Sequence, residues 1–170
     1  MADDFGDVIA EPKEEKDKGR LYEFLLGRVR AIADKSEAKQ GKLFALCSLL
    51  HDFVPAFDWV GFYMVDETKA SELVLGPYVG KPTEHERIPF GRGVCGQVAE
   101  TEQPLIVQDV SREDNYLSCS PDVKSEIVIP ITKDGKFIGE LDIDSKMPAP
   151  FDDRDRAFLE KVCEIVAEIM

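Results

Sequence analysis

The chain has 170 residues, enough for one domain with a hydrophobic core, and 44% of its residues are apolar. A net charge of −13, from 34 acidic and 21 basic side chains, argues against binding to nucleic acid or to an anionic membrane surface. The sequence has no apolar run of about 18 residues, as a membrane span requires. The start, MADDFGDVIAEPKEEKDKG, lacks the apolar segment of a secretory signal, so we expect a cytoplasmic protein.

The chain begins with a charged segment and then becomes helical. Residues 1–19 predict a disordered tail, which leaves 20–170 as the folded domain. A first helix is expected where apolar residues recur every three or four positions, at Leu21, Phe24, Leu25, Val29 and Ile32. A second helix is predicted over residues 36–51, before Pro55.

The middle of the chain predicts strands. In residues 58–66 apolar side chains occupy both faces, which is typical of a central strand covered on both sides. Further strands are predicted at 72–80, 104–109, 125–132 and 136–145. The last two form a hairpin, because Asp134-Gly135 is a strong turn signal.

Two more helices complete the pattern. A short one is expected over residues 94–101, and a long one begins near Asp152 and Asp153, both of which can cap it. With this order of elements the sequence predicts an α+β domain, in which helices pack on the faces of an antiparallel sheet.

Acidic residues alternate along the second strand of the hairpin. Glu140, Asp142 and Asp144 point to one face, and Glu126 on the partner strand can join them. On this pattern alone, a face exposed to solvent is the more common arrangement. Residues 137–138 are apolar on both faces, however, which favours a buried cluster able to bind a cation or hold a proton.

Trp59, the only tryptophan, and Tyr63 share one strand face. Such a pair usually belongs to a hydrophobic core. Beside the carboxylates, it would instead form a site for a small cationic or zwitterionic ligand. The rings would hold apolar or sulfur-bearing atoms, and the carboxylates an ammonium group.

The four cysteines differ in their surroundings. Cys47 and Cys163 lie on the apolar sides of predicted helices and are expected in the core. Cys119 lies in a polar loop, where packing does not explain it. The sequence has no CxxC pair, and its two histidines are not at zinc-ligand spacing. It therefore predicts neither a metal site nor a cofactor.

Cys95 stands in the glycine-rich stretch FGRGVCGQVAE. Two interpretations remain open from the residues alone. It is either a small residue in a tight turn after Gly91 and Gly93, or a reactive thiol whose thiolate is stabilised by the N-terminus of the following helix.

Several motifs together resemble the free methionine-(R)-sulfoxide reductase family, which consists of single-domain GAF proteins. They are WVGFY at 59–63, LGP at 75–77, RIP at 87–89, GRGVCG at 91–96, SEIVIP at 125–130 and ELDIDS at 140–145. The resemblance implies a GAF fold with a twisted antiparallel sheet of about six strands. It also implies reduction of the R-sulfoxide of free methionine, thioredoxin as reductant and a homodimer.

The resemblance also implies roles for individual residues. The nucleophile of the family corresponds to Cys119, which would attack the sulfoxide sulfur and become a sulfenic acid, and a second thiol would then form a disulfide with it. The cysteine of the Gly-Val-Cys-Gly motif corresponds to Cys95. The substrate-binding residues correspond to Trp59, Tyr63, Glu126, Asp142 and Asp144. A carboxyl group kept neutral by its neighbours, Glu140 included, could protonate the sulfoxide oxygen.

One position departs from the family. His85 stands where the family usually carries a third cysteine, the main resolving thiol. We therefore expect either Cys95 or an external thiol to resolve Cys119. His85 is either a surface residue or a neighbour that lowers the pKa of Cys119. Alternative functions are a non-catalytic GAF module that binds a small ligand, or a redox sensor that uses Cys95 and Cys119.

Overall fold

The computed structural model describes residues 17–118 and 120–170. Most of the predicted tail, residues 1–16, lies outside this range, as does Cys119; the first helix begins at Lys18. The elements, in chain order, are α1 (Lys18–Ala33), α2 (Lys39–Phe53), β1 (Trp59–Val65), β2 (Glu72–Val79), β3 (Arg87–Pro89), α3 (Gly93–Thr101), β4 (Leu105–Val107), η2 (Val110–Arg112), β5 (Ser125–Lys133), β6 (Lys136–Ser145) and α4 (Asp153–Ile169). The α+β prediction is confirmed.

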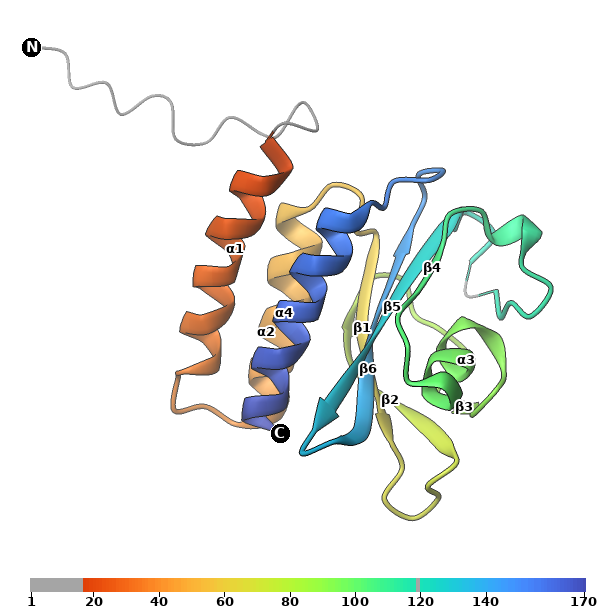
Figure 1. Ribbon diagram of the computed structural model, residues 1–170, viewed down its shortest axis with the longest axis horizontal. Helices are drawn as coiled ribbons and strands as arrows, with labels where there is room; N and C mark the ends of the chain where they lie inside the picture. The colour runs from red at the N-terminus through yellow and green to blue at the C-terminus, as the bar shows by residue number, and fades with distance from the viewer. Residues whose placement is uncertain (1–16, 119) are drawn as a thin grey trace, which may run out of the picture.

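The six strands form one antiparallel sheet in the order β3-β2-β1-β6-β5-β4. Strands β1 and β6 lie at its centre, as the apolar pattern of residues 58–66 predicted. Helices α1, α2 and α4 lie on one side of the sheet, and α3 lies on the other (Figure 1). The hairpin of β5 and β6 turns through Asp134 and Gly135, whose φ angles of 52° and 76° suit this tight turn. The edge strand β3 was not predicted, because three residues are too short for a periodic signal.

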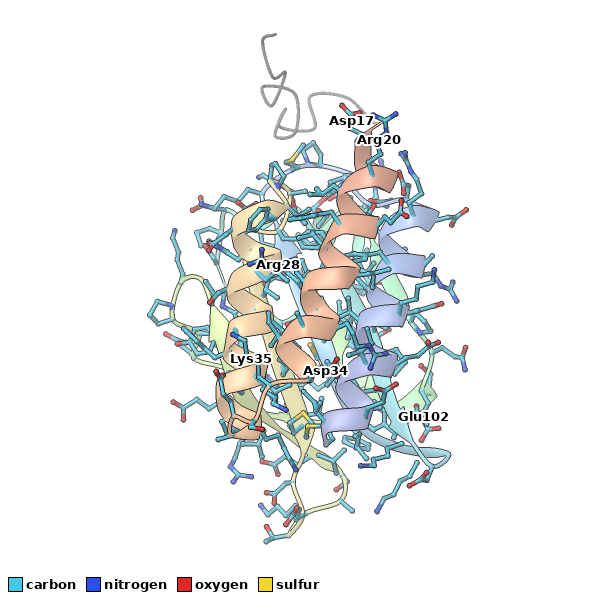
Figure 2. The ribbon with its side chains drawn as sticks, turned by 90° about the vertical axis from the view of Figure 1, so that its left-hand side faces the viewer. Asp17, Arg20, Arg28, Asp34, Lys35 and Glu102 are labelled. Carbon is cyan, nitrogen blue, oxygen red and sulfur yellow. The ribbon has the colours of Figure 1, made fainter. Side chains whose placement is uncertain are left out.

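Most of the hydrophobic core lies between the sheet and the helical layer. Val60 and Phe62 of β1 and Leu141 and Ile143 of β6 are fully buried there. Viewed from this side, α1 lies in front of the other helices, between α2 and α4 (Figure 2). Helix α1 turns Tyr22, Leu25, Val29 and Ala33 inward, whereas Phe24 is 51% exposed although the apolar spacing had grouped it with Leu25.

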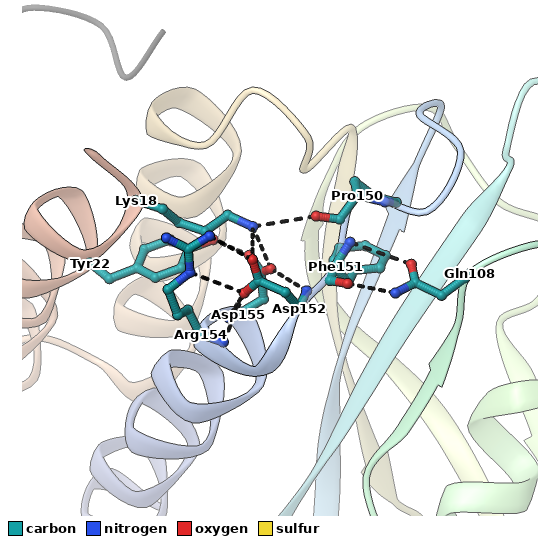
Figure 3. Close-up of polar contacts among 8 residues, drawn as sticks. All are labelled: Lys18, Tyr22, Gln108, Pro150, Phe151, Asp152, Arg154 and Asp155. Carbon is teal, nitrogen blue, oxygen red and sulfur yellow. Dashed lines mark hydrogen bonds and ion pairs between the residues drawn. The ribbon is translucent and has the colours of Figure 1, made fainter. Parts of the chain in front are cut away.

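A polar junction fastens the start of α1 to the start of α4 (Figure 3). Asp155 is buried, and its carboxylate accepts hydrogen bonds from the Tyr22 hydroxyl and, at 2.6 Å, from Lys18 Nζ. Asp155 also accepts a bond from the backbone N–H of Asp152, whose side chain caps the helix in return. This capping box confirms the predicted start of the last helix. The Tyr22–Asp155 hydrogen bond joins this start to α1, 133 residues earlier in the chain.

Gln108 connects the edge strand β4 to the segment just before α4. Its side chain accepts a hydrogen bond from the Phe151 N–H at 3.4 Å and donates one to the Phe151 carbonyl. Gln108 follows β4, so the segment leading into the loop at 110–118 is held against the start of α4 (Figure 3).

Within residues 17–118 and 120–170, no helix has the length and apolar character needed to cross a membrane.

The exposed middle of α1 contains a glycine, Gly27, whose replacement by alanine is expected to stabilise the protein. No described atom lies within 4 Å of the position that a Cβ at Gly27 would occupy. Glycine lowers the stability of a helix interior by about 0.8–1 kcal/mol relative to alanine. Gly27→Ala is therefore expected to raise the free energy of unfolding by roughly that amount, measured by urea denaturation. Gly139→Ala should do the opposite, because its Cβ would lie 2.6 Å from the Tyr63 carbonyl oxygen.

Candidate functional site

Four carboxyl groups lie on the face of the sheet that α3 covers. Glu126, Glu140, Asp142 and Asp144 are at most 6% exposed, so the alternative of a solvent-exposed face is wrong. Burial raises the pKa of Glu140, Asp142 and Asp144, and the charge of Asp142 raises the other two further. Glu126 stands directly opposite Asp144 in the pairing of β5 with β6. Burial thus favours the neutral forms of the three acids on β6.

Cys95 lies in the first turn of α3, directly over this acidic face. It is 4% exposed, and its Sγ is 3.9 Å from Glu126 Oε1. Burial raises the pKa of the Cys95 thiol well above its usual value, and the charges of Asp142, Glu140 and Glu126 raise it further. The thiol form of Cys95 is therefore favoured in this structure, which is opposite to the effect that a helix N-terminus alone would have.

The glycine turn before Cys95 is fixed by its own backbone and by Asn115. Gly91 N–H donates to the Gly96 carbonyl at 2.7 Å, and Gly93 has a φ of 67°, which glycine adopts at little cost. The Asn115 side chain accepts from Gly93 N–H at 2.7 Å and donates to the Gly91 carbonyl at 2.8 Å. The loop before Cys119 is therefore anchored to the turn before Cys95. Sequence reasoning missed Asn115, because an asparagine in a polar loop is unremarkable without its partners.

Two small cavities lie along this face. The first has a volume of about 10 Å³, and five residues singled out from the sequence line it: Tyr63, His85, Cys95, Glu126 and Asp142. The second, of about 50 Å³, is lined by Trp59 and Asp144 together with Lys81 and Lys146. The structure thus brings both cavities to neighbouring positions on β1 and β6, where Trp59 pairs with Asp144 and Gly61 with Asp142.

The Trp59 indole is fixed from three directions. Its Nε1–H donates to the Lys81 carbonyl at 3.0 Å, and its ring stacks with Tyr78 at a centroid distance of 5.4 Å. The ring also lies over Gly61, where a Cβ would be 2.7 Å from Trp59 Cζ3 and 2.8 Å from Tyr78 Cβ. Tyr63 stacks more distantly, with centroids 6.4 Å apart. The aromatic pair predicted from the sequence is therefore part of this site.

His85 is half-buried and contacts the loop that contains Cys119. Its Nε2 lies 3.1 Å from the Ser118 carbonyl oxygen, and since a carbonyl only accepts, Nε2 carries the proton. The Tyr63 hydroxyl donates to the His85 carbonyl at 2.8 Å. His85 therefore contacts the residue before Cys119, which itself lies outside the described residues.

The remaining thiols differ from Cys95. Cys47 and Cys163 are buried in the core, as predicted, and burial raises the pKa of both. Cys95, Glu126 and Asp142, by contrast, each direct a ligand atom to one place, and these atoms lie within 4.8 Å of one another. The three residues come from three separate elements, so a search for closely spaced ligands in the sequence does not find them.

Comparison with known proteins identifies a matching family model, similar sequences and similar solved structures. The family model for the GAF domain matches residues 42–170. A free methionine-R-sulfoxide reductase of Saccharomyces cerevisiae is 38% identical over 82% of this chain and 76% of the relative. One of Escherichia coli is 35% identical over 72% of each chain. The crystal structure of the Neisseria meningitidis reductase in complex with its substrate covers 90% of both chains, with a TM-score of 0.84 and 38% identity.

Proposed function

We propose that this chain, which belongs to the GAF domain family, reduces free methionine-R-sulfoxide to methionine with thiols as the source of electrons. A GAF fold alone does not determine an activity. The observation that carries the proposal is the placement of Cys95 and His85 with the acids Glu126 and Asp142 around one cavity, beside Trp59. The similarity to named reductases over most of the chain supports the same reaction.

The chemistry of the site suits a zwitterion that contains sulfur. The indole of Trp59 and the ring of Tyr63 offer apolar surface to a methyl–sulfur group, and buried carboxylates offer acceptors to an ammonium group. A neutral carboxyl group of Asp142 or Asp144 can donate to the sulfoxide oxygen. The cavity beside Cys95 has room for about one water molecule. Substrate binding therefore requires that the covering residues, His85 and Leu117 among them, move apart.

The reaction that we propose consists of two steps at sulfur. The Cys119 thiol attacks the sulfoxide sulfur; methionine leaves, and the oxygen remains on Cys119 as a sulfenic acid. The Cys95 thiol then forms a disulfide with Cys119, and the hydroxyl leaves as water. Thioredoxin, acting on a homodimer in the cytoplasm, would return both thiols to the reduced form. Cys95 is the described cysteine suited to this role, because Cys47 and Cys163 lie in the core behind the sheet.

An assay with matched substrates tests the proposal. The reduced protein is expected to release methionine from free methionine-R-sulfoxide with dithiothreitol or thioredoxin, and to leave the S-sulfoxide and a sulfoxide-containing peptide unchanged. Mass spectrometry after one turnover should show a Cys95–Cys119 disulfide. Binding of the sulfoxide without methionine release would instead indicate a non-catalytic ligand-binding module. Oxidation of the thiols that alters the protein but consumes no substrate would indicate a redox sensor.

The packing of Trp59 over Gly61 makes a further prediction. Gly61→Ala is expected to displace the indole, because the added methyl group would collide with its ring. Such overpacking should lower the free energy of unfolding by about 1–3 kcal/mol, and the displaced indole should lower kcat/KM as well. Because Trp59 is the only tryptophan, its fluorescence spectrum should shift in the same variant. Gly27→Ala, on the far side of the sheet, is the control; unchanged kinetics and fluorescence in Gly61→Ala would contradict the prediction.

A further inference from the structure

We propose that Cys95, Glu126 and Asp142 form a binding site for a single Zn²⁺ ion, which blocks the site reversibly. The three side chains come from α3, β5 and β6 and meet at the wall of the smaller cavity. The proposed zinc binding does not depend on the reductase activity: these residues could bind zinc even if the chain reduced another substrate or none. The blocking effect alone rests on the proposed function.

The separations between the three ligand atoms suit a small ion. Ligands at tetrahedral zinc, with bonds of about 2.0–2.3 Å, lie roughly 3.5 Å from one another. Here the Cys95 Sγ and Glu126 Oε1 are 3.9 Å apart, and all three ligand atoms lie within 4.8 Å of each other. Contraction by up to about 1.3 Å would therefore complete the coordination, which changes of side-chain rotamer can supply.

An unpaired oxygen independently indicates a missing partner. Asp142 is 2% exposed and lines the cavity; its side chain interacts with Glu126 and Cys95, but its Oδ1 makes no hydrogen bond to any part of the chain that the structure describes. A buried carboxyl oxygen without a partner is costly, and a cation relieves that cost directly. The neighbouring Glu140 is fully buried, with both oxygens unpaired among the same residues, so the excess of acceptors extends beyond one atom.

The size of the cavity and the ligand types favour zinc over other ligands. A volume of about 10 Å³ has room for about one water molecule, and so for one metal ion. Calcium and magnesium prefer sets of oxygen ligands alone, with six or more positions. One sulfur and two carboxylate oxygens instead form the mixed set that zinc accepts, with water in the fourth position.

Zinc at this position would occupy the groups that the reductase reaction needs. Cys95 would be held in a metal–sulfur bond, and Glu126 and Asp142 would no longer be available to the substrate. Removal of the metal with a chelator would restore all three. Inhibition should therefore be competitive with free methionine-R-sulfoxide and reversed by EDTA.

Direct metal titration tests the site without an activity assay. The reduced full-length chain is titrated with Zn²⁺ by calorimetry, and with Cd²⁺ by the absorbance of the thiolate-to-cadmium charge-transfer band. We expect one ion per chain. Cys95→Ser should abolish the cadmium band and, like Glu126→Gln and Asp142→Asn, weaken zinc binding at least about tenfold. Cys119→Ser and Cys163→Ala should bind as the unmodified chain does.

Three results would overturn the proposal: absence of zinc binding by the unmodified chain, unchanged affinity in Cys95→Ser, or loss of binding in Cys119→Ser. Thermal unfolding of each metal-free variant shows that it is folded before titration. Reductase assays in EDTA are run in parallel. Zinc binding without reductase activity would refute the proposed function and leave the metal site standing, and activity without zinc binding would do the reverse.

Discussion

Cys119→Ser is expected to abolish the reduction of free methionine-R-sulfoxide, with a fall in kcat of at least about a thousandfold, the scale of loss when a catalytic nucleophile is removed. The physical reason is that a serine hydroxyl is a far weaker nucleophile than a thiolate and forms no sulfenic acid. Methionine release is measured by amino-acid analysis with dithiothreitol as reductant. Full activity of this variant would refute the assignment of Cys119 as nucleophile.

Cys95→Ser provides the matched comparison. It retains the nucleophile, so one methionine per chain should still be released in a single turnover. The thioredoxin-driven cycle should slow markedly, because no thiol at position 95 remains to form the disulfide. Equal rates for Cys95→Ser and the unmodified chain through many turnovers would show that an external thiol resolves Cys119 instead.

Asp155→Ala is expected to lower the free energy of unfolding by about 3 kcal/mol, the largest stability effect that we predict. The substitution leaves the buried Tyr22 hydroxyl without its carboxylate partner, removes the shorter of the two ion pairs of Lys18, and removes half of the capping box of α4. For a domain of this size the midpoint of thermal unfolding should fall by about 6–12 °C. Differential scanning calorimetry measures the change.

A neighbour in the same helical turn serves as the control. Asp153 is exposed and also lies in the first turn of α4, where it faces the same helix dipole. Asp153→Ala should change the midpoint by about a degree or two at most, because it removes a charge near the helix N-terminus and no buried contact. If Asp153→Ala and Asp155→Ala had equal effects, the junction between α1 and α4 would not stabilise the domain.

The sequence predicts the central strands and the hairpin well, because apolar alternation and the Asp134-Gly135 turn are local signals. It also identifies the aromatic and acidic residues of the site, since Trp59 and Asp142 stand in recognisable motifs. It leaves open whether Asp142 and its neighbours are buried, because the acidic alternation and the apolar residues before it point in opposite directions. Their cover is α3, which lies about forty positions earlier in the chain, and strand periodicity contains no information about it.

For the same reason, the sequence predicts neither the raised pKa of the Cys95 thiol nor the hydrogen bonds of Asn115. A helix N-terminus predicts a low pKa for a thiol, but burial, and after it the carboxylates of β5 and β6, raise the pKa of Cys95 instead. Asn115 acts through hydrogen bonds to Gly91 and Gly93, more than twenty residues away. Both depend on contacts between distant segments, which local patterns do not encode.

The acids on the sheet have a consequence for how this domain responds to selection. Glu140, Asp142 and Asp144 carry buried oxygens that are unpaired within the described residues, so each weakens the folded state. Replacing such groups with apolar residues of similar volume often stabilises a protein. In a library sorted only for heat resistance, substitutions at these positions should therefore be enriched. In cells that depend on methionine sulfoxide for growth, substitutions at Asp142 and Asp144 should instead be lost. The same carboxyl groups lower the stability of the protein and are needed for the proposed production of methionine.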